Sequence, residues 1–201
     1  MSISSLVGAL GIVFVWYQTR LLRRQLAADH ERSRRELTLN LLQHWNSSIT
    51  PVTAAAEKIV HRLNDEQCRE LANLRSFKLS ATHRPLLETC LSEVLGGEEL
   101  KPVNDQIELT EKQVTRLHFL ISDYLNETEA VILGWHQSIA DRDIIEREFS
   151  FLYDEAKGKD ALTRYRKASG GHENYPALEK FMEALRERKQ SEGPPRRAPV
   201  A

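Results

Sequence analysis

The first nineteen residues of the chain contain no charged side chain, and this uncharged start constrains the protein more than any other feature. At a helical rise of about 1.5 Å per residue they span roughly 28 Å, close to the hydrocarbon core of a bilayer. Trp16 and Tyr17 lie where an interfacial aromatic belt is expected, and two leucines follow Arg20. The sequence therefore predicts a transmembrane anchor over residues 1–22. The alternative is a buried core helix, because the run is short for a span.

Positive charge follows the apolar segment, whereas a cleavable signal peptide carries it in front. Six arginines stand against Asp29 and Glu31, which leaves a local excess of four charges. The six are Arg20, Arg23, Arg24, Arg32, Arg34 and Arg35. The positive-inside rule then places the N-terminus outside and the body in the cytoplasm, with a single pass through the inner (cell) membrane. We interpret these arginines as contacts to anionic lipid at the membrane surface.

Beyond the anchor the composition favours helices, because 9 Gly and 7 Pro are a thin supply of turn residues for a sheet protein. Neither Gly nor Pro occurs from Gln18 to Trp45, so the anchor is predicted to continue as an Arg-rich helical stalk over residues 23–45. A helical bundle is expected over residues 46–190. Residues 191–201 contain three Pro and no apolar period, which predicts a disordered tail. The expected fold class is all-α.

The strongest helical pattern begins at Thr110, which forms a capping box with Gln113. Apolar residues then recur in steps of three and four, which predicts a buried helix face about thirty residues long. The face comprises Val114, Leu117, Ile121, Tyr124, Leu125, Thr128, Val131, Ile132, Trp135 and Ile139. Asp141 is predicted to cap a following helix that extends to Ala156, Pro176 to open the last helix, and residues 98–109 to form a connector.

Four polar residues lie beside this apolar face or just after it, and they have two interpretations. In the first, Asn126, Glu129 and Asp141 bond to helix ends inside the bundle and fix its register. In the second, Glu129, Asp141 and Asp143 are weak candidates for catalytic residues that surround a hard cation such as Mg²⁺. We favour the structural interpretation, because buried polar groups serve packing specificity more often than catalysis.

Several kinds of chemistry lack their sequence signature. No phosphate-binding glycine loop or G-x-S-x-G turn occurs, and the seven histidines never pair at the i, i+4 spacing of metal ligands. Cys68 and Cys90 have no partner motif and are expected to be reduced, buried and inert. We therefore expect no cofactor, no metal and no specific nucleic acid; the net charge of −1 provides no general attraction to nucleic acid either.

The stretch from Tyr124 to Phe149 resembles a bacterial domain-of-unknown-function family (DUF4760-like) of small proteins with an N-terminal membrane anchor and a helical body. A Leu-Asn pair, a Glu three residues later and an Asp opening the next helix recur in that family. Leu125, Asn126, Glu129 and Asp141 occupy those places in this sequence. The resemblance implies the architecture and no particular reaction.

The sequence thus supports one main functional hypothesis and one alternative. The main hypothesis is a membrane-tethered cytoplasmic interaction or sensing module without catalytic activity, in the role of a bacterial envelope or anti-phage factor. Its partners are the lipid bilayer and an unidentified protein or a second copy of the chain. The alternative is a metal-dependent hydrolase or nuclease effector that uses the carboxylates near the long helix.

Overall fold

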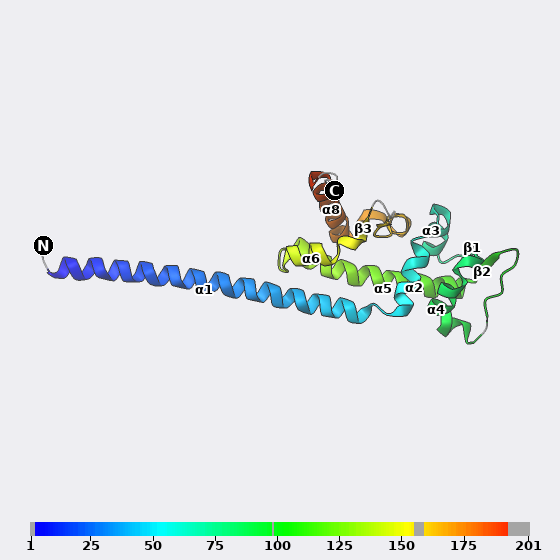
Figure 1. The fold of residues 1–201 in the computed structure, drawn as a ribbon, viewed down its shortest axis with the longest axis horizontal. Coiled ribbons are helices and arrows are strands. Elements are labelled where there is room, and N and C mark those ends of the chain that lie inside the picture. The colour runs from blue at the N-terminus through cyan, green and yellow to red at the C-terminus, as the bar shows by residue number, and fades with distance from the viewer. Residues whose placement is uncertain (1–2, 98, 155–158, 193–201) are drawn as a thin grey trace, which may run out of the picture.

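One long helix projects from a smaller helical body, as the ribbon in Figure 1 shows. The computed structural model describes residues 3–97, 99–154 and 159–192, and the backbone alone for 3–13, 154, 159, 172 and 192. Helix α1 runs from Ile3 to Ser48 without a break. At about 1.5 Å per residue its 46 residues extend for about 70 Å, which is why its first half stands clear of the body.

The body consists mainly of short helices grouped around one long one. The helices are α2 (Pro51–Val60), α3 (Asp65–Ala72), α4 (Arg84–Leu95), α5 (Glu111–His136), α6 (Arg142–Glu148), α7 (Thr163–Ala168) and α8 (Pro176–Glu192). The 3-10 turns are η1 (Ala81–His83), η2 (Ser150–Leu152) and η4 (Gly171–Glu173). The strands β1 (Phe77–Ser80) and β2 (Gln106–Leu109) form one antiparallel pair, and β3 (Tyr153–Asp154) and β4 (Lys159–Asp160) form another. The described fold is therefore mostly helical, in agreement with the expected class.

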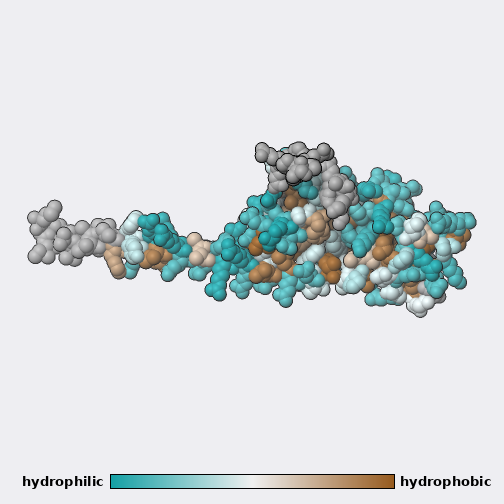
Figure 2. Space-filling model, viewed as in Figure 1, coloured by the Kyte–Doolittle hydropathy of each residue, from teal (hydrophilic) through white to brown (hydrophobic). Residues whose placement is uncertain are grey.

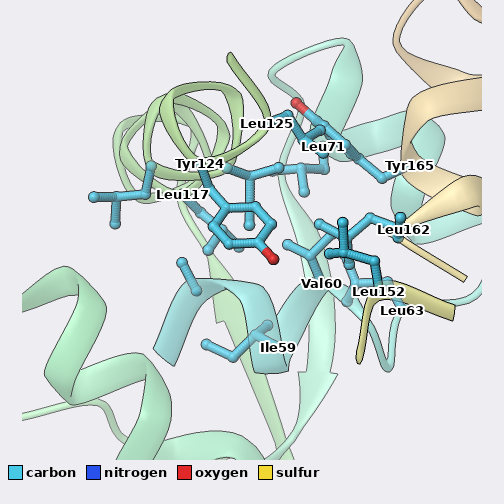
Figure 3. Packing of buried hydrophobic residues seen from close by; sticks show 14 of the residues in the cluster. Ile59, Val60, Leu63, Leu71, Leu117, Tyr124, Leu125, Leu152, Leu162 and Tyr165 are labelled. Carbon is cyan, nitrogen blue, oxygen red and sulfur yellow. The ribbon is translucent and has the colours of Figure 1, made fainter. Parts of the chain in front are cut away.

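Helix α5 is the centre of the body, and its apolar face is buried as its three-and-four spacing predicts. Leu117, Ile121 and Leu125 have no exposed surface. Figure 3 shows the Tyr124 ring beside Val60 of α2, and Leu125 beside Leu71. Leu71, Leu152 and Tyr165 enclose the same cluster from α3, η2 and α7. One apolar core therefore joins the elements on either side of α5.

Helix ends follow the sequence signals. Thr110 and Gln113 form the reciprocal capping box at the start of α5. Thr50 accepts a hydrogen bond from the amide of Thr53 in front of Pro51, and Gly96 ends α4 in the left-handed conformation that glycine tolerates. The predicted last helix begins at Pro176 and buries Phe181 among its inner residues. These local signals predict the helix ends correctly because they satisfy backbone N–H and C=O groups that have no partner within the helix.

The predicted connector over residues 98–109 contains a strand that the sequence did not reveal. Asn104 and Asp105 both adopt positive φ angles and form a tight two-residue turn between Val103 and Gln106. Strand β2 then pairs with β1 and buries alternate residues. Four residues are too few for an alternating pattern to stand out, and the turn has Asn-Asp in place of the Asn-Gly or Asp-Gly that usually signals a hairpin.

Two further boundaries differ from the sequence expectation. The helix that Asp141 caps ends at Glu148, where the chain tightens into η2, instead of reaching Ala156, which lies outside the described residues. Ile139 was assigned to the buried face of the long helix but lies beyond its end and is 49% exposed. The predicted disordered tail falls outside the described residues from position 193 onward, and residue 191 belongs to α8.

Among the helices of the described residues, none has a stretch that is both long enough and apolar enough to cross a membrane.

We predict that Trp135→Ala destabilises the protein by about 3 to 5 kcal/mol. Trp135 is 3% exposed, packs edge-on against Phe181 at 5.0 Å between ring centroids, and donates its indole N–H to Glu146. His136 is exposed, so His136→Ala should change stability by no more than about 0.5 kcal/mol. Urea unfolding of both variants measures the difference. A larger loss for His136→Ala would contradict the assigned orientation of α5.

Candidate functional site

The C-terminal quarter of α1 is docked on the body through side-chain contacts to α5 and to the turn that follows it. Trp45 donates its indole N–H to the hydroxyl of Thr128 on α5 at 3.2 Å. Its ring meets Phe149 edge-on, with 4.9 Å between centroids. His44 pairs with Glu127 at 3.1 Å. Helix α1 is therefore fixed along the flank of α5.

A glycine on α5 allows the two helices to approach closely. A methyl group placed on Gly134 would lie 2.9 Å from Cδ1 of Leu41 and 3.5 Å from Cβ of Ala140. Any side chain at this position would have to displace Leu41. Gly134 therefore keeps a groove in α5 open for the docked helix, and this explains a glycine in a helix interior, where it normally costs about 1 kcal/mol.

The turn between α5 and α6 is bonded to α1 through a fully buried hydroxyl. Thr38 has no exposed surface; its Oγ1 donates to the carbonyl of Arg34 at 2.7 Å and accepts the amide of Asp141 at 2.7 Å. Arg34 donates to the carbonyl of Ala140 at 3.3 Å, and Nε of Arg35 lies 3.9 Å from Oδ2 of Asp141. The structure thus places Arg34 and Arg35 at this joint, whereas the sequence analysis assigned both to the membrane surface.

We predict that Thr38→Val loosens the joint, because the buried amide of Asp141 loses its acceptor at a cost of about 1 to 3 kcal/mol. Thr19→Val is a matched control: Thr19 makes the same hydrogen bond to the carbonyl four residues earlier, at 2.8 Å, but is exposed. Hydrogen exchange at the Asp141 amide should accelerate by about tenfold or more in Thr38→Val and stay unchanged in Thr19→Val. Equal exchange rates of the Asp141 amide in both variants would contradict its hydrogen bond to Thr38.

Glu129 and Asp141, two of the candidate catalytic residues, are bonded to the starts of helices. The carboxylate of Glu129 accepts the amides of Ala177 and Leu178, both at 2.8 Å, at the start of α8. Oδ1 of Asp141 accepts the amide of Ile144 as the cap of α6. A carboxylate at a helix start satisfies free amides and interacts favourably with the helix dipole. Bonding to helix ends is what the structural interpretation describes for these two residues, whereas Asn126, the third residue that it includes, is exposed.

Asn126 and Asp143 lie elsewhere, in two separate hollows. Asn126 is exposed and lines a cavity of about 330 Å³ beside Ser48 and Asp123. Asp143 lines a groove of about 550 Å³ between α6 and α8. Its other lining residues are Glu146, Arg147, Ser150, Leu185, Arg188 and Lys189. Although three apart on α5, Asn126 and Glu129 therefore do not share a site.

The carboxylates do not converge on a metal position. Within the described ranges, no three His, Cys, Asp or Glu side chains form a group suited to hold a metal ion. In the α6–α8 groove, Glu146 accepts from both Trp135 and Arg188, and the ammonium of Lys189 donates to the carbonyl of Tyr153. The groove is lined by side chains of both charges together with Leu185.

A buried ion pair next to Glu129 was missed by sequence reasoning. The sequence suggests a solvated face around Arg164, Tyr165, Arg166 and Lys167, yet Arg166 is only 1% exposed. Its guanidinium pairs with Glu179 on α8 and also bonds to the carbonyl of Ala161. Because α7 is six residues long, no periodic pattern could reveal which of its residues face inward. The pair ties α7 to α8.

His118 and Tyr165 form a second half-buried polar contact that sequence reasoning did not anticipate. The hydroxyl of Tyr165 lies 2.9 Å from Nδ1 of His118 and 3.5 Å from the hydroxyl of Ser122. Burial lowers the pKa of His118, against a smaller opposite effect from a hydrogen bond to the backbone of Leu71. Burial also raises the pKa of Tyr165 to about 12. The imidazole is therefore held neutral, with Nδ1 placed to accept from the phenol.

We predict that the protein loses stability as the pH falls through about 6.5 and below. The unfolded chain binds a proton on His118 near pH 6.5, while the folded chain resists protonation, so acid favours unfolding. His118→Gln should reduce the loss between pH 7 and pH 5, leaving the part due to His83, whose pKa burial also lowers. His136→Gln, at an exposed position, should retain the full loss. Thermal unfolding at several pH values measures the loss of stability in both variants. If His118→Gln and the unmodified protein lost stability equally between pH 7 and pH 5, the role of His118 would be refuted.

The two cysteines are buried and free, as the sequence analysis predicts. Burial raises the pKa of the Cys68 thiol to about 11 and that of Cys90 to about 12. The thiolate is the reactive form, so both thiols are poor nucleophiles at neutral pH.

Comparison of the chain with known protein families, curated proteins and solved structures finds no match. The resemblance of residues 124–149 to a bacterial family therefore stays a prediction. Its residues have definite places in the structure: Leu125 is in the core, while Glu129 and Asp141 bond helix starts.

Proposed function

We propose that this chain is a membrane-tethered interaction module that holds a helical body at a fixed height above the cytoplasmic face of the inner (cell) membrane. One observation carries the proposal: a single unbroken helix contains both the uncharged N-terminal segment and the residues docked on the body. A rigid helix of this kind transmits position and orientation, which a flexible linker does not.

The free part of α1 exposes apolar surface of the kind that lipid covers. Phe14, Val15 and Trp16 are 60% to 61% exposed, and Tyr17 is 55% exposed. Arg20 stacks over the Trp16 ring at 5.5 Å, so its charge lies beside an aromatic residue, as at a membrane interface. Figure 2 shows this helix emerging from the body as a bare rod with apolar and polar residues together on its surface. The segment proposed to enter lipid is residues 1–22, of which the structure describes α1 from Ile3 onward.

The distance along α1 sets the height of the body. From Arg20 to the first docked residue, Arg34, the helix rises about 20 Å, more than the Debye length of about 8 to 10 Å at physiological salt. The body then lies beyond the field of the lipid headgroups and presents its surface to a partner in solution. The α6–α8 groove, lined by side chains of both charges and by Leu185, is the surface that we propose for this partner.

We predict that the full chain stays in the membrane fraction after carbonate washing and that a reporter fused after Ala201 is active only in the cytoplasm. The physical reason is the uncharged segment followed by the excess of arginine. Moving three arginines in front of Ile3 should weaken or invert the orientation. As a control, substituting Arg34 and Arg35, which contact the body, should leave the orientation unchanged. Recovery of the full chain in the soluble fraction would overturn the anchor.

Activity of the proposed module should depend on the anchor and not on the carboxylates of the alternative hypothesis. Asp141→Asn, which keeps a side-chain oxygen to cap α6, should leave cellular activity intact, whereas deletion of residues 1–22 should abolish it. The opposite result would favour the metal-dependent hydrolase or nuclease.

A further inference from the structure

Helix α1 carries an apolar stripe, most of which the body does not cover. Val15, Leu22, Leu26, Ser33 and Leu37 follow one another in steps of seven, four, seven and four, which is an eleven-residue repeat. At 100° per residue these positions share one face of the helix. Val15, Leu22 and Leu26 are 61% to 64% exposed, and Leu37 is 36% exposed. Val15, Leu22 and Leu26 thus lie along about 17 Å of helix with most of their surface exposed, while Leu37, at the edge of the docked part, is partly covered by the body.

This stripe is separate from the docked face of α1. Trp45, whose indole bonds to the body, lies twelve residues after Ser33, which turns it by about 120° around the helix axis. Thr38 follows Leu37 and lies about 100° away. The body therefore occupies one side of α1, and the stripe faces another direction along the free part of the helix.

The period and the flanking charges identify what fits the stripe. An eleven-residue repeat stays in contact over several turns only with a helix of nearly the same period, and a second copy of α1 provides it. Arg23 and His30 flank the stripe on one side, and Asp29 and Glu36 flank it on the other. In a parallel pair the flanks of opposite charge meet, whereas in an antiparallel pair like charges face each other. Within the described residues, Arg23, Asp29 and Glu36 pair with no charged group of their own chain.

We propose that two copies of the chain associate in parallel along this stripe of α1. The steps of seven and four also reach back to Gly11 and Ser4, small residues that allow helices to approach closely in lipid. Parallel association is compatible with anchoring in one membrane but does not depend on it, because the exposed leucines and the charged flanks lie beyond Arg20. The two docked bodies then extend away from the shared stripe.

Cysteine cross-linking in the full chain tests the pairing. Leu22→Cys and Ser33→Cys are eleven residues apart on the stripe, and Ala28→Cys is an exposed control about 140° from Ser33 around the helix. The two native cysteines are buried, so the unmodified chain gives the background. In a parallel pair both stripe variants should form disulfide-linked dimers, with at least tenfold more product than Ala28→Cys. In an antiparallel pair at most one could do so.

A second pair of variants tests whether the apolar side chains hold the dimer. Leu26 and Leu39 are both 61% exposed, but Leu39 lies on another face of α1. In the Ser33→Cys background, Leu26→Glu should reduce cross-linked dimer at least fivefold, while Leu39→Glu should not change it. Equal cross-linking at residues 33 and 28, an unchanged yield in Leu26→Glu, or a cross-link from residue 33 to a different protein would each overturn the proposal. Because the assay is read in whichever fraction holds the chain, its result is separate from that of the anchor test.

Discussion

The contact between α1 and α5 determines how the rest of the molecule is arranged. Without it, α1 would be a free helix whose direction is unrelated to the body. Thr38 and Trp45 fix that direction, because a buried hydroxyl and an indole N–H each have few acceptable partners and lose free energy when unpaired. Gly134 makes the close approach sterically possible. The joint therefore combines specific hydrogen bonds with the apolar packing of Trp45 on Phe149.

The same physical solution recurs at the helix starts of the body. Glu129 reaches from α5 to the first amides of α8, and Asp141 caps α6 while its own amide bonds to Thr38. These carboxylates thus tie elements that lie far apart in the sequence. Desolvating a carboxylate at a helix start costs free energy, but each hydrogen bond that it accepts from a backbone amide offsets part of that cost. In the sequence these residues look like an acid and a ligand. In the structure their carboxylates accept backbone amides at helix starts.

The sequence predicts most of the fold, because local rules determine most of it. The capping box at Thr110, the Gly96 stop and the apolar period of α5 each act within a few residues and appear in the structure. The sequence does not predict which distant groups meet. Nothing near Thr38 indicates the amide of Asp141, and nothing near Arg166 indicates Glu179, because such pairs arise from tertiary packing. For Asp141 the sequence predicted the cap of the following helix, which the structure has, but for Glu129 it did not indicate the start of α8 as the partner.

Because α1 is one continuous helix, none of its three surfaces can rotate independently of the others. The uncharged start, the exposed stripe and the docked face belong to one helix without an interior proline, so a rotation at one end is carried to the other. Its only interior glycines, Gly8 and Gly11, precede both the stripe beyond Arg20 and the joint. In a parallel pair, a change in how the stripes meet would therefore rotate each body through the Thr38–Asp141 bond. If the body did not follow this rotation, either the Thr38–Asp141 bond would break or α1 would have to bend. Bending α1 would break several of its backbone hydrogen bonds. In the tethered module that we propose, this rigidity would couple events in the membrane to the orientation of the surface proposed to bind a partner.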